Sequence, residues 1–496
     1  MMSYRAIKLP DGIKHSFWSV LDAGLYPVVY LATVPLMMRS MGMVTFGLWI
    51  LLNSIITILQ LFNFNSGIAG LGVATIRNIT DGLANNDTER VRDVINSIFQ
   101  ITFFLFVFVC CIGWGLSYAA VRYSWWDIKD APGANVSLCV LLAAVIAGLK
   151  YFDQIFQSII KACEKFKLSS ILNMVCRFGL LGITIIMAVE KYSLAAILFA
   201  NIVFIIAYLL IQLCCVKWIL PLWKPSSVKN KKLYRYLLRF STWPWLQSVI
   251  IVLTFQTDRF WVSSYAGLKE VSSYGLVSTM FSHIHMIITA MVVWILPHIA
   301  IMTSKGDDPA RMYNLVRSGL FSVVVILLLV FFFISPFLFR LWVGAETYAG
   351  MSAYIKGFVA FEIVFAHTIM PFFYLNATGK ERLATKATLF YCSTCYMLML
   401  AGLWLFHSPA AMIGGMTIAM CITMPFINAI VQQNMHHSYS WKLAILEMLP
   451  MYAAILLVYG NGNMWLYLLL IPVLFVLLWK FYSSTVFKNR LWQHTR

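Results

Sequence analysis

The chain has 496 residues, of which 61% are hydrophobic and only 11% are charged, and its mean hydropathy is +0.80. A soluble domain carries about a quarter charged residues, so this composition excludes a water-soluble globular protein. The formal charge of +18 does not indicate nucleic-acid binding. Its largest basic cluster, residues 217–240, lies between two long apolar runs and is typical of a membrane topology anchor that contacts lipid headgroups.

Apolar runs of about 20 residues recur along the whole chain, and each can cross a hydrocarbon core about 30 Å thick at 1.5 Å per residue. In lipid, a helix satisfies its own backbone hydrogen bonds, whereas an open sheet does not. We therefore expect an all-α polytopic membrane protein. About fourteen spans are predicted, near residues 16–38, 46–76, 96–121, 136–160, 169–189, 194–216, 241–265, 272–302, 318–338, 351–376, 388–406, 412–432, 443–458 and 464–479.

Basic residues predict the orientation of these spans. If both termini are cytoplasmic, 27 of the 37 Lys and Arg residues fall on the inside and six on the outside. Their density is then about twice as high inside, which is the asymmetry that positive cytoplasmic loops produce. The first run is too long for the core of a signal peptide, so we expect no cleaved targeting segment.

A displaced similarity indicates that the chain contains two related halves. A shift of 225 residues, to within one position, aligns Gly42 with Gly267, Trp49 with Tyr274, Leu71 with Leu296 and Ala74 with Ala300. A shift of 221 places Asp87 and Arg90 on Asp308 and Arg311. Six helices separate the copies, so the repeats are parallel, with an axis along the membrane normal. We expect a lobe at 1–222, a second lobe at 223–440, and two further helices with a cytoplasmic tail at 441–496.

Several stretches resemble the Wzx-type O-antigen flippases, which are bacterial polysaccharide transport proteins. They are LMMRSMGMVTFGLWILLNSI and FNSGIAGLGVATIRNI in the first half, and FQTDRFWVSSYAGLKEVSSYGLVSTM, FRLWVGAETYAG and FFYLNATGKERLATKA in the second. The resemblance covers most of residues 16–432 and implies the multidrug, oligosaccharidyl-lipid and polysaccharide (MOP) exporter superfamily, in which two six-helix lobes alternate access. The two extra helices are similar to those of lipid II flippases or colanic-acid exporters.

The same resemblance implies a cargo of undecaprenyl-pyrophosphate-linked oligosaccharide, such as an O-antigen repeat unit of lipopolysaccharide. It would move from the cytoplasmic to the periplasmic leaflet of the bacterial inner membrane. Membrane lipids are expected contacts, and a polysaccharide polymerase and a chain-length regulator are candidate partners. No nucleic-acid partner and no cofactor are expected.

Placing a charged residue inside a membrane span costs free energy, so such residues normally face a cavity or a partner. Arg259, Arg177 and Lys150 are the candidate substrate-binding residues, because Lys and Arg pair with phosphate and Arg does so bidentately. A local ion pair of Lys150 with Asp153, three residues away on one helical face, stays an equal alternative. A fourth interior cation is Lys356.

Four interior acids are candidates for coupling or cavity roles, although a buried structural role is an alternative for each. They are Asp258, Asp153, Asp22 and Glu362. His367 is a further group that a coupling proton could titrate, whereas Glu447 is expected near the cytoplasmic end of its span, where water access makes a charge inexpensive.

Metal and redox sites are not expected. His283, His285 and His298 lack a Cys or carboxylate that would complete a ligand set. The single CxxC, at Cys392 and Cys395, lies in an apolar stretch and is better explained by packing.

Two other functions compete with the flippase interpretation. A multidrug antiporter of the same superfamily would need an acidic cavity, whereas the interior candidates here comprise four bases and four acids. A membrane enzyme such as a polysaccharide polymerase usually needs a sizeable external loop, and no predicted outside loop exceeds about 15 residues. The sequence also has no Walker-type phosphate loop, so we expect a carrier and not an enzyme.

Overall fold

The computed structural model describes residues 9–63, 71–122, 135–221, 223, 242–435 and 441–460, with the side chains of residues 9–24 left undescribed. Every regular element within these ranges is an α-helix or a short 3-10 helix, as expected for an all-α membrane protein. The described chain divides into two compact units, at Met1–Ser272 and Ser273–Arg496. The predicted lobe boundaries after residues 222 and 440 stay predictions.

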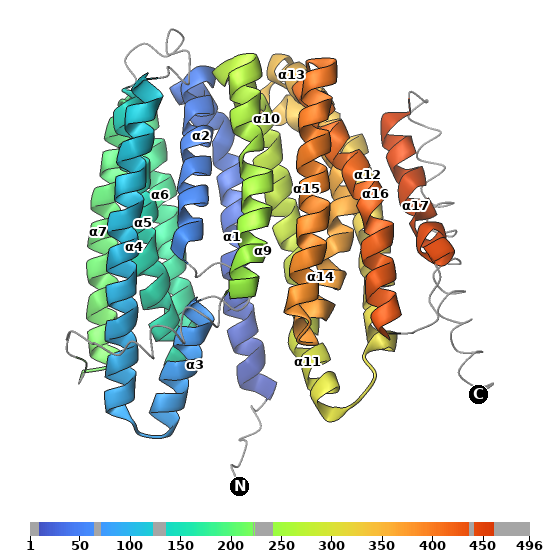
Figure 1. The fold of residues 1–496 in the computed structure, drawn as a ribbon. Helices are drawn as coiled ribbons and strands as arrows, with labels where there is room; N and C mark the ends of the chain where they lie inside the picture. The colour runs from blue at the N-terminus through green and yellow to red at the C-terminus, as the bar shows by residue number, and fades with distance from the viewer. Residues whose placement is uncertain are drawn as a thin grey trace. The chain divides into compact units, whose positions relative to one another are not determined.

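The first unit is a helical bundle in which α5 packs against α2, α3, α4, α6 and α7. Figure 1 shows α4, α5, α6 and α7 side by side in its blue and green part. A buried apolar cluster from α3 to α7 forms its core. The elements are α1 (Leu9–Met41), α2 (Met43–Leu59), the 3-10 helix η1 (Gln60–Asn63), α3 (Leu71–Ala84), α4 (Thr88–Arg122), α5 (Val136–Ala162), α6 (Phe166–Val189), α7 (Leu194–Ile219), α9 (Thr242–Gln256) and the start of α10 (Asp258–Val292).

The second unit surrounds α13. The stretch Ala345–Ala377, which contains α13, is the most buried of the membrane-length stretches, with 89% of its apolar window inside. It packs against α12, α16 and α17. The elements are the rest of α10, α11 (Ile295–Lys305), α12 (Ala310–Val343), α13 (Ala345–Phe365), the 3-10 helix η3 (Ala366–Thr368), α14 (Ile369–Ala377), α15 (Glu381–Phe406), α16 (Pro409–Met435) and α17 (Trp441–Tyr459).

Ten helical stretches of the described chain are long and apolar enough to cross a membrane. They contain eleven of the fourteen predicted spans, because Trp245–Val292, at 48 residues, is long enough for both the seventh and the eighth. The first and thirteenth predicted spans fall on α1 and α17. The fourteenth, residues 464–479, lies outside the described residues.

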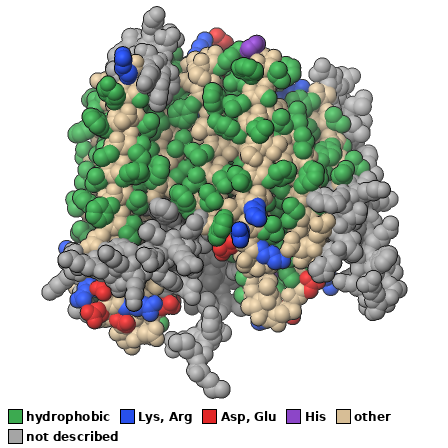
Figure 2. Space-filling view, in the orientation of Figure 1, with side chains coloured by type: hydrophobic (Ala, Val, Ile, Leu, Met, Phe, Trp, Pro, Cys, Tyr) green, Lys and Arg blue, Asp and Glu red, His purple; other side chains and the backbone are tan. Residues whose placement is uncertain are grey.

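The surface of the helices is apolar where lipid would contact it. Phe104 and Trp114 on α4 are 73% and 70% exposed, and exposed apolar side chains recur on the other long helices. Figure 2 shows hydrophobic side chains over the middle of the visible face, with acidic and basic side chains toward its upper and lower ends. Apolar exposure on this scale marks a membrane-facing surface, so the chain is a multi-pass membrane protein.

One predicted span, over 272–302, was too long. For the span predicted over 46–76, the structure describes α2 and η1 as far as Asn63 and α3 from Leu71, and residues 64–70 lie outside the described residues. The span predicted over 272–302 ends at Val292, and α11 starts at Ile295 with Pro297 in its first turn. A proline there has no backbone N–H to continue the preceding helix. Unbroken hydrophobicity concealed this break.

The backbone repeats the pattern that the displaced similarity predicted. Gly42 has φ 76° and ψ 158°, and Gly267 has φ 81° and ψ 174°, a region open to glycine but hardly to other residues. Asp87 accepts a hydrogen bond from the backbone N–H of Arg90, three residues on, and Asp308 from that of Ala310, two residues on, each at 2.9 Å and each at the start of a helix. The two aligned aspartates both bind a helix start, although their donors are not equivalent positions.

Candidate functional site

Arg259 and Asp258 lie at the start of α10, inside the first unit. Arg259 is 5% exposed, and its Nη1 donates a hydrogen bond of 3.0 Å to the Ser54 hydroxyl of α2. The Asp258 side chain accepts a hydrogen bond from the Arg259 backbone N–H at 2.8 Å. The Arg259 guanidinium is directed toward α2.

Arg177 on α6 lies over an aromatic ring of α1. Its guanidinium carbon is 5.5 Å from the centroid of the Tyr26 ring, which is a cation–π distance. Tyr26 in turn stacks on Tyr30 at 5.9 Å. The half-buried arginine is thus oriented by α1.

Asp153 on α5 is bound by α7 and not by its sequence neighbour. Its Oδ1 accepts hydrogen bonds from the Gln212 amide at 2.8 Å and the Tyr208 hydroxyl at 3.2 Å. Within the described part of the chain, no ion pair of 4 Å or less joins it to Lys150. The geometry therefore does not favour a local ion pair of Lys150 with Asp153. Lys150 is half-buried, and the Asp153 carboxylate is hydrogen-bonded to other residues.

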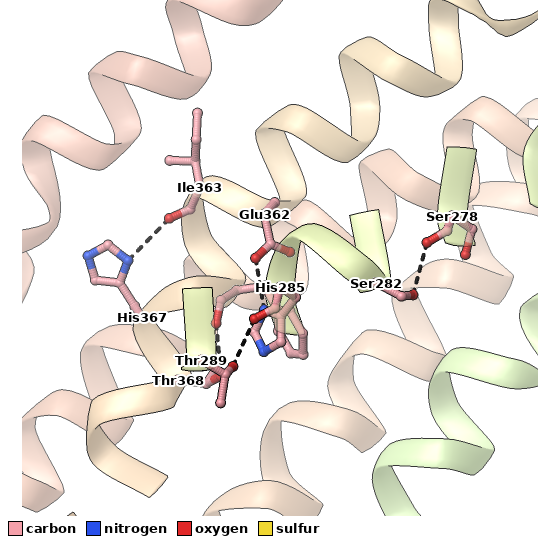
Figure 3. A network of polar contacts seen from close by, with 9 residues as sticks. Ser278, Ser282, His285, Thr289, Glu362, Ile363, His367 and Thr368 are labelled. Atoms are coloured by element: carbon pink, nitrogen blue, oxygen red, sulfur yellow. Dashed lines mark hydrogen bonds and ion pairs between the residues drawn. The ribbon is translucent and has the colours of Figure 1, made fainter. Parts of the chain in front are cut away.

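Glu362 of α13 and His285 of α10 form a buried acid–imidazole pair in the second unit (Figure 3). The Glu362 Oε1 atom lies 2.8 Å from the His285 Nδ1 atom. Glu362 is 2% exposed, whereas the His285 side chain is 22% exposed and its ring stacks on Phe365 at 4.3 Å. The carboxylate is therefore enclosed, and its imidazole partner reaches the surface of the unit.

His367 does not join this pair, although it lies one turn further along the chain. Its Nδ1 hydrogen-bonds the Ile363 carbonyl at 3.1 Å (Figure 3), and its ring packs against Phe321 at 4.1 Å. A structural role therefore explains its position. Among the described residues, no three His, Cys, Asp or Glu side chains are arranged to hold a metal ion.

A buried polar triad of Arg317, Asn428 and Glu447 was missed by the sequence analysis. Arg317 of α12 donates to Glu447 of α17 at 2.9 Å and to Asn428 of α16, and the Asn428 amide donates to Glu447 at 2.9 Å. The expectation that Glu447 has water access was wrong, because it is 4% exposed. Arg317 was overlooked because the predicted span began one residue after it.

The remaining predicted residues do not converge on one point. Lys356 of α13 donates to the Tyr459 carbonyl of α17 at 3.4 Å. Asp22 lies on α1, but its side chain is outside the described part of the structure. Cys392 and Cys395 are buried free thiols, and Cys395 contacts the Met416 carbonyl of α16, which is a packing position.

The helices define a multi-pass α-helical membrane protein with charged groups enclosed between its spans. Residues 14–303, more than half of the chain, match the family of polysaccharide biosynthesis proteins, and the chain belongs to this family. No curated protein sequence matches it. The resemblance to bacterial polysaccharide proteins is thereby confirmed at the level of this family.

Solved structures with a similar fold include a flippase and multidrug transporters. The lipid II flippase MurJ in an inward closed conformation has a TM-score of 0.66 at 11% identity, covering 97% of this chain and 100% of that one. A multidrug resistance MATE family transporter in an inward-facing conformation has a TM-score of 0.61 at 13% identity, covering 85% and 96%. The MATE multidrug transporter DinF-BH has a TM-score of 0.62 at 12% identity, covering 88% and 97%. At these identities the likeness shows the fold.

Proposed function

We propose that this protein is a flippase that carries an undecaprenyl-pyrophosphate-linked oligosaccharide from the cytoplasmic to the periplasmic leaflet of the bacterial inner membrane by alternating access. The observation that carries the proposal is membership of the polysaccharide biosynthesis family over residues 14–303. The fold shared with a lipid II flippase supports it, because that protein's cargo is also a lipid. Both termini are cytoplasmic in this proposal.

Arg259, Arg177 and Lys150 supply positive charge to the cargo's diphosphate. Arg259 supports this role best, because it is a buried guanidinium, a planar fork of several donors that matches phosphate oxygens. The polyprenyl tail stays in lipid, where its transfer requires no polar contact. The reaction is movement across the membrane without covalent change, so the protein acts as a carrier and not as an enzyme.

Glu362, Asp153, Asp258 and Asp22 are the acids that link transport to an ion or shape the cavity. Of these, Glu362 is the strongest coupling candidate, because its partner His285 is both titratable and partly exposed. A coupling ion can then reach an otherwise enclosed carboxylate through the imidazole. Asp153 and Asp258 are held by hydrogen bonds within the first unit and are better suited to positioning the neighbouring cations.

Replacement of Arg259 tests the proposal. In a strain that lacks the native protein, Arg259→Lys should reduce surface polysaccharide partly and Arg259→Ala severely, because Lys keeps the charge but loses the bidentate fork. Membrane abundance of each variant must be measured alongside. The matched control is Arg92→Ala, which removes an exposed arginine of α4 whose partner Glu89 lies on the same helix.

The possible results of this experiment have different meanings. Normal polysaccharide from Arg259→Ala at normal abundance would contradict the cargo role. Loss of transport at normal abundance supports it, whereas loss of both transport and protein assigns Arg259 to the internal stability of the first unit. Resistance of the same strain to organic cations separates the flippase from the multidrug antiporter. If the protein were an antiporter, Arg259→Ala would change this resistance and leave surface polysaccharide unaffected.

A further inference from the structure

The partly exposed side chains of α2 form a single row along the helix, and that row is polar. Between residues 45 and 60, all but one of the partly exposed residues lie three or four positions apart, which places them one above another on the helix surface. The exception is Ile58. We refer to the others as the α2 row, which consists of Thr45, Trp49, Asn53, Thr57 and Gln60.

Contact with lipid does not explain the α2 row. The exposed positions in the middle of α4 and α7 carry apolar side chains, such as Phe104, Val107 and Val203, as a lipid-facing surface requires. The α2 row extends from about 3 Å to about 26 Å beyond the helix start at Met43, which is most of the thickness of a hydrocarbon core. Lipid offers polar groups at this depth no hydrogen bond. The row therefore faces water or a polar ligand.

The two largest side chains of the α2 row have unused hydrogen-bonding groups. Trp49 and Gln60 make no side-chain hydrogen bond to any residue that the structure describes. Asn53 donates to the Trp49 carbonyl and Thr57 to the Asn53 carbonyl, each at 2.8 Å, so their side-chain oxygens are still available as acceptors. The row thus presents an indole N–H, a complete primary amide and several acceptor oxygens, without any charge.

The equivalent part of the second half does not keep this exposure. The displacement of 225 residues places Trp49 on Tyr274 and Thr57 on Ser282. Ser282, like Thr57, donates a hydrogen bond to the carbonyl four residues before it. Tyr274, however, is fully buried, and the centroid of its ring lies 5.6 Å from that of Tyr354. The partly exposed aromatic side chain is therefore a feature of the first unit and not of the repeat.

We propose that the α2 row binds the neutral sugar residues of the cargo. This inference rests on the proposed flippase function and adds a recognition surface for the part of the cargo that carries no phosphate. A sugar ring has an apolar C–H face and a hydroxyl edge, which match the flat face of the Trp49 indole and the amides of Asn53 and Gln60. Because no member of the row is charged, the row suits hydroxyl and acetamido groups and not carboxylates.

The contact of Arg259 with α2 supports this assignment. Arg259 donates a hydrogen bond of 3.0 Å to the hydroxyl of Ser54, which directly follows Asn53 on α2. The cation that the proposed function assigns to the diphosphate therefore meets α2 at the middle of the row. Sugars joined to that diphosphate can lie along the helix, because Asn53 and Gln60 are seven residues, or about 10 Å, apart.

Binding of two lipids to the purified full-length protein separates the sugar contact from the phosphate contact. One probe is the polyprenyl-pyrophosphate-linked oligosaccharide isolated from cells that make the surface polysaccharide, and the other is the same polyprenyl pyrophosphate without sugar. The native protein should bind the glycosylated lipid about tenfold more tightly or better. Trp49→Ala and Gln60→Leu should each reduce this preference by about threefold to tenfold, the effect of one lost stacking contact or hydrogen bond, and leave binding of the sugar-free lipid unchanged.

Two further variants are the matched controls. Trp114→Ala removes a 70% exposed tryptophan from the lipid-facing surface of α4 and should leave the preference for the glycosylated lipid unchanged. Arg259→Ala should weaken binding of both lipids by the same factor, because both carry the diphosphate. A loss of sugar preference confined to the α2 row would therefore support the proposal.

Thr57→Val covers the case in which a larger change prevents folding, since valine keeps the shape of the threonine side chain and removes only its hydroxyl. It should also reduce the preference for the glycosylated lipid. The sugar role of the α2 row is overturned if the native protein binds both lipids equally, or if its preference survives the substitutions that fold. Failure of the native protein to bind either lipid would instead contradict the proposed function.

Discussion

Glu362 and Glu447 are both enclosed carboxylates of the second unit, but their partners give them different roles. Glu447 of α17 is bound by the permanently charged Arg317 of α12 and by Asn428 of α16, so its partners come from two other helices. Glu362 is bound by one imidazole that can itself gain or lose a proton. We therefore expect Glu447 to affect folding and Glu362 to affect transport.

Glu362→Gln should separate transport from folding. The amide keeps the size of the side chain and can still hydrogen-bond His285, but it cannot carry a charge. We expect surface polysaccharide to fall roughly tenfold or more, the effect of about 1.4 kcal/mol on a rate, at unchanged protein abundance. Glu346→Gln, an exposed position at the start of the same helix, is the control and should change neither quantity. Full output from Glu362→Gln would exclude a coupling role.

Glu447→Ala should destabilise the protein. Removing one partner leaves the Arg317 charge buried, which typically lowers the free energy of unfolding by about 3–5 kcal/mol. Glu89→Ala removes the 80% exposed partner of Arg92 and should lower it by less than about 1 kcal/mol. Denaturant unfolding of the purified variants in one detergent provides the comparison. Equal effects of the two substitutions would show that the triad is not a stabilising element.

At the residue scale, the sequence predicts which charges are interior but not how they pair. Asp153, Asp258, Arg259 and Glu362 were all identified from their positions within apolar runs. His285, however, lies 77 residues from Glu362, and Arg317 lies 130 from Glu447. Such partners are brought together only by helix packing, which the hydrophobic pattern of each helix does not encode.

At the scale of elements, Gly267 turns one apolar run into two helical segments. Its φ of 81° and ψ of 174° fall in a region that residues with a Cβ rarely occupy. Gly267→Ala should therefore lower the free energy of unfolding by about 1–3 kcal/mol. The measurement is thermal unfolding of the purified variant and of the native protein, which differ in α10 only at position 267.

Gly182→Ala is the control for this substitution. Gly182 lies within α6, and a Cβ there would meet no atom within 4 Å. Alanine should be neutral or should stabilise the helix by about 0.5–1 kcal/mol. If Gly267→Ala is as well tolerated as Gly182→Ala, the positive φ of Gly267 does not shape this part of the chain.

Helix existence was easier to predict than helix ends. Spans such as 136–160, 169–189 and 194–216 agree with α5, α6 and α7 to within about three residues, because Asn135 and Ser193 cap two of them and short loops separate all three. The break at Val292 was missed, since hydropathy responds to the membrane and not to backbone geometry.

At the scale of the whole molecule, composition and the recurring apolar runs were sufficient to predict a polytopic helical membrane protein, because helices satisfy their own backbone hydrogen bonds in lipid. The family followed from a few short stretches and is confirmed by the match over residues 14–303. In the proposed function, recognition of the cargo depends on how a few cations such as Arg259 and Arg177 are positioned.

Translocation by the purified protein is the most direct test of the flippase. Liposomes would contain the protein and a polyprenyl-pyrophosphate-linked oligosaccharide, and a membrane-impermeant glycosidase would report the oligosaccharide in the outer leaflet. The account predicts that the native protein exposes the inner-leaflet oligosaccharide to the enzyme, whereas Arg259→Ala leaves it protected, as in protein-free liposomes. The account would be contradicted if the oligosaccharide stayed protected from the glycosidase in liposomes that contain the native protein, while the same protein exchanged an organic cation across the same membrane.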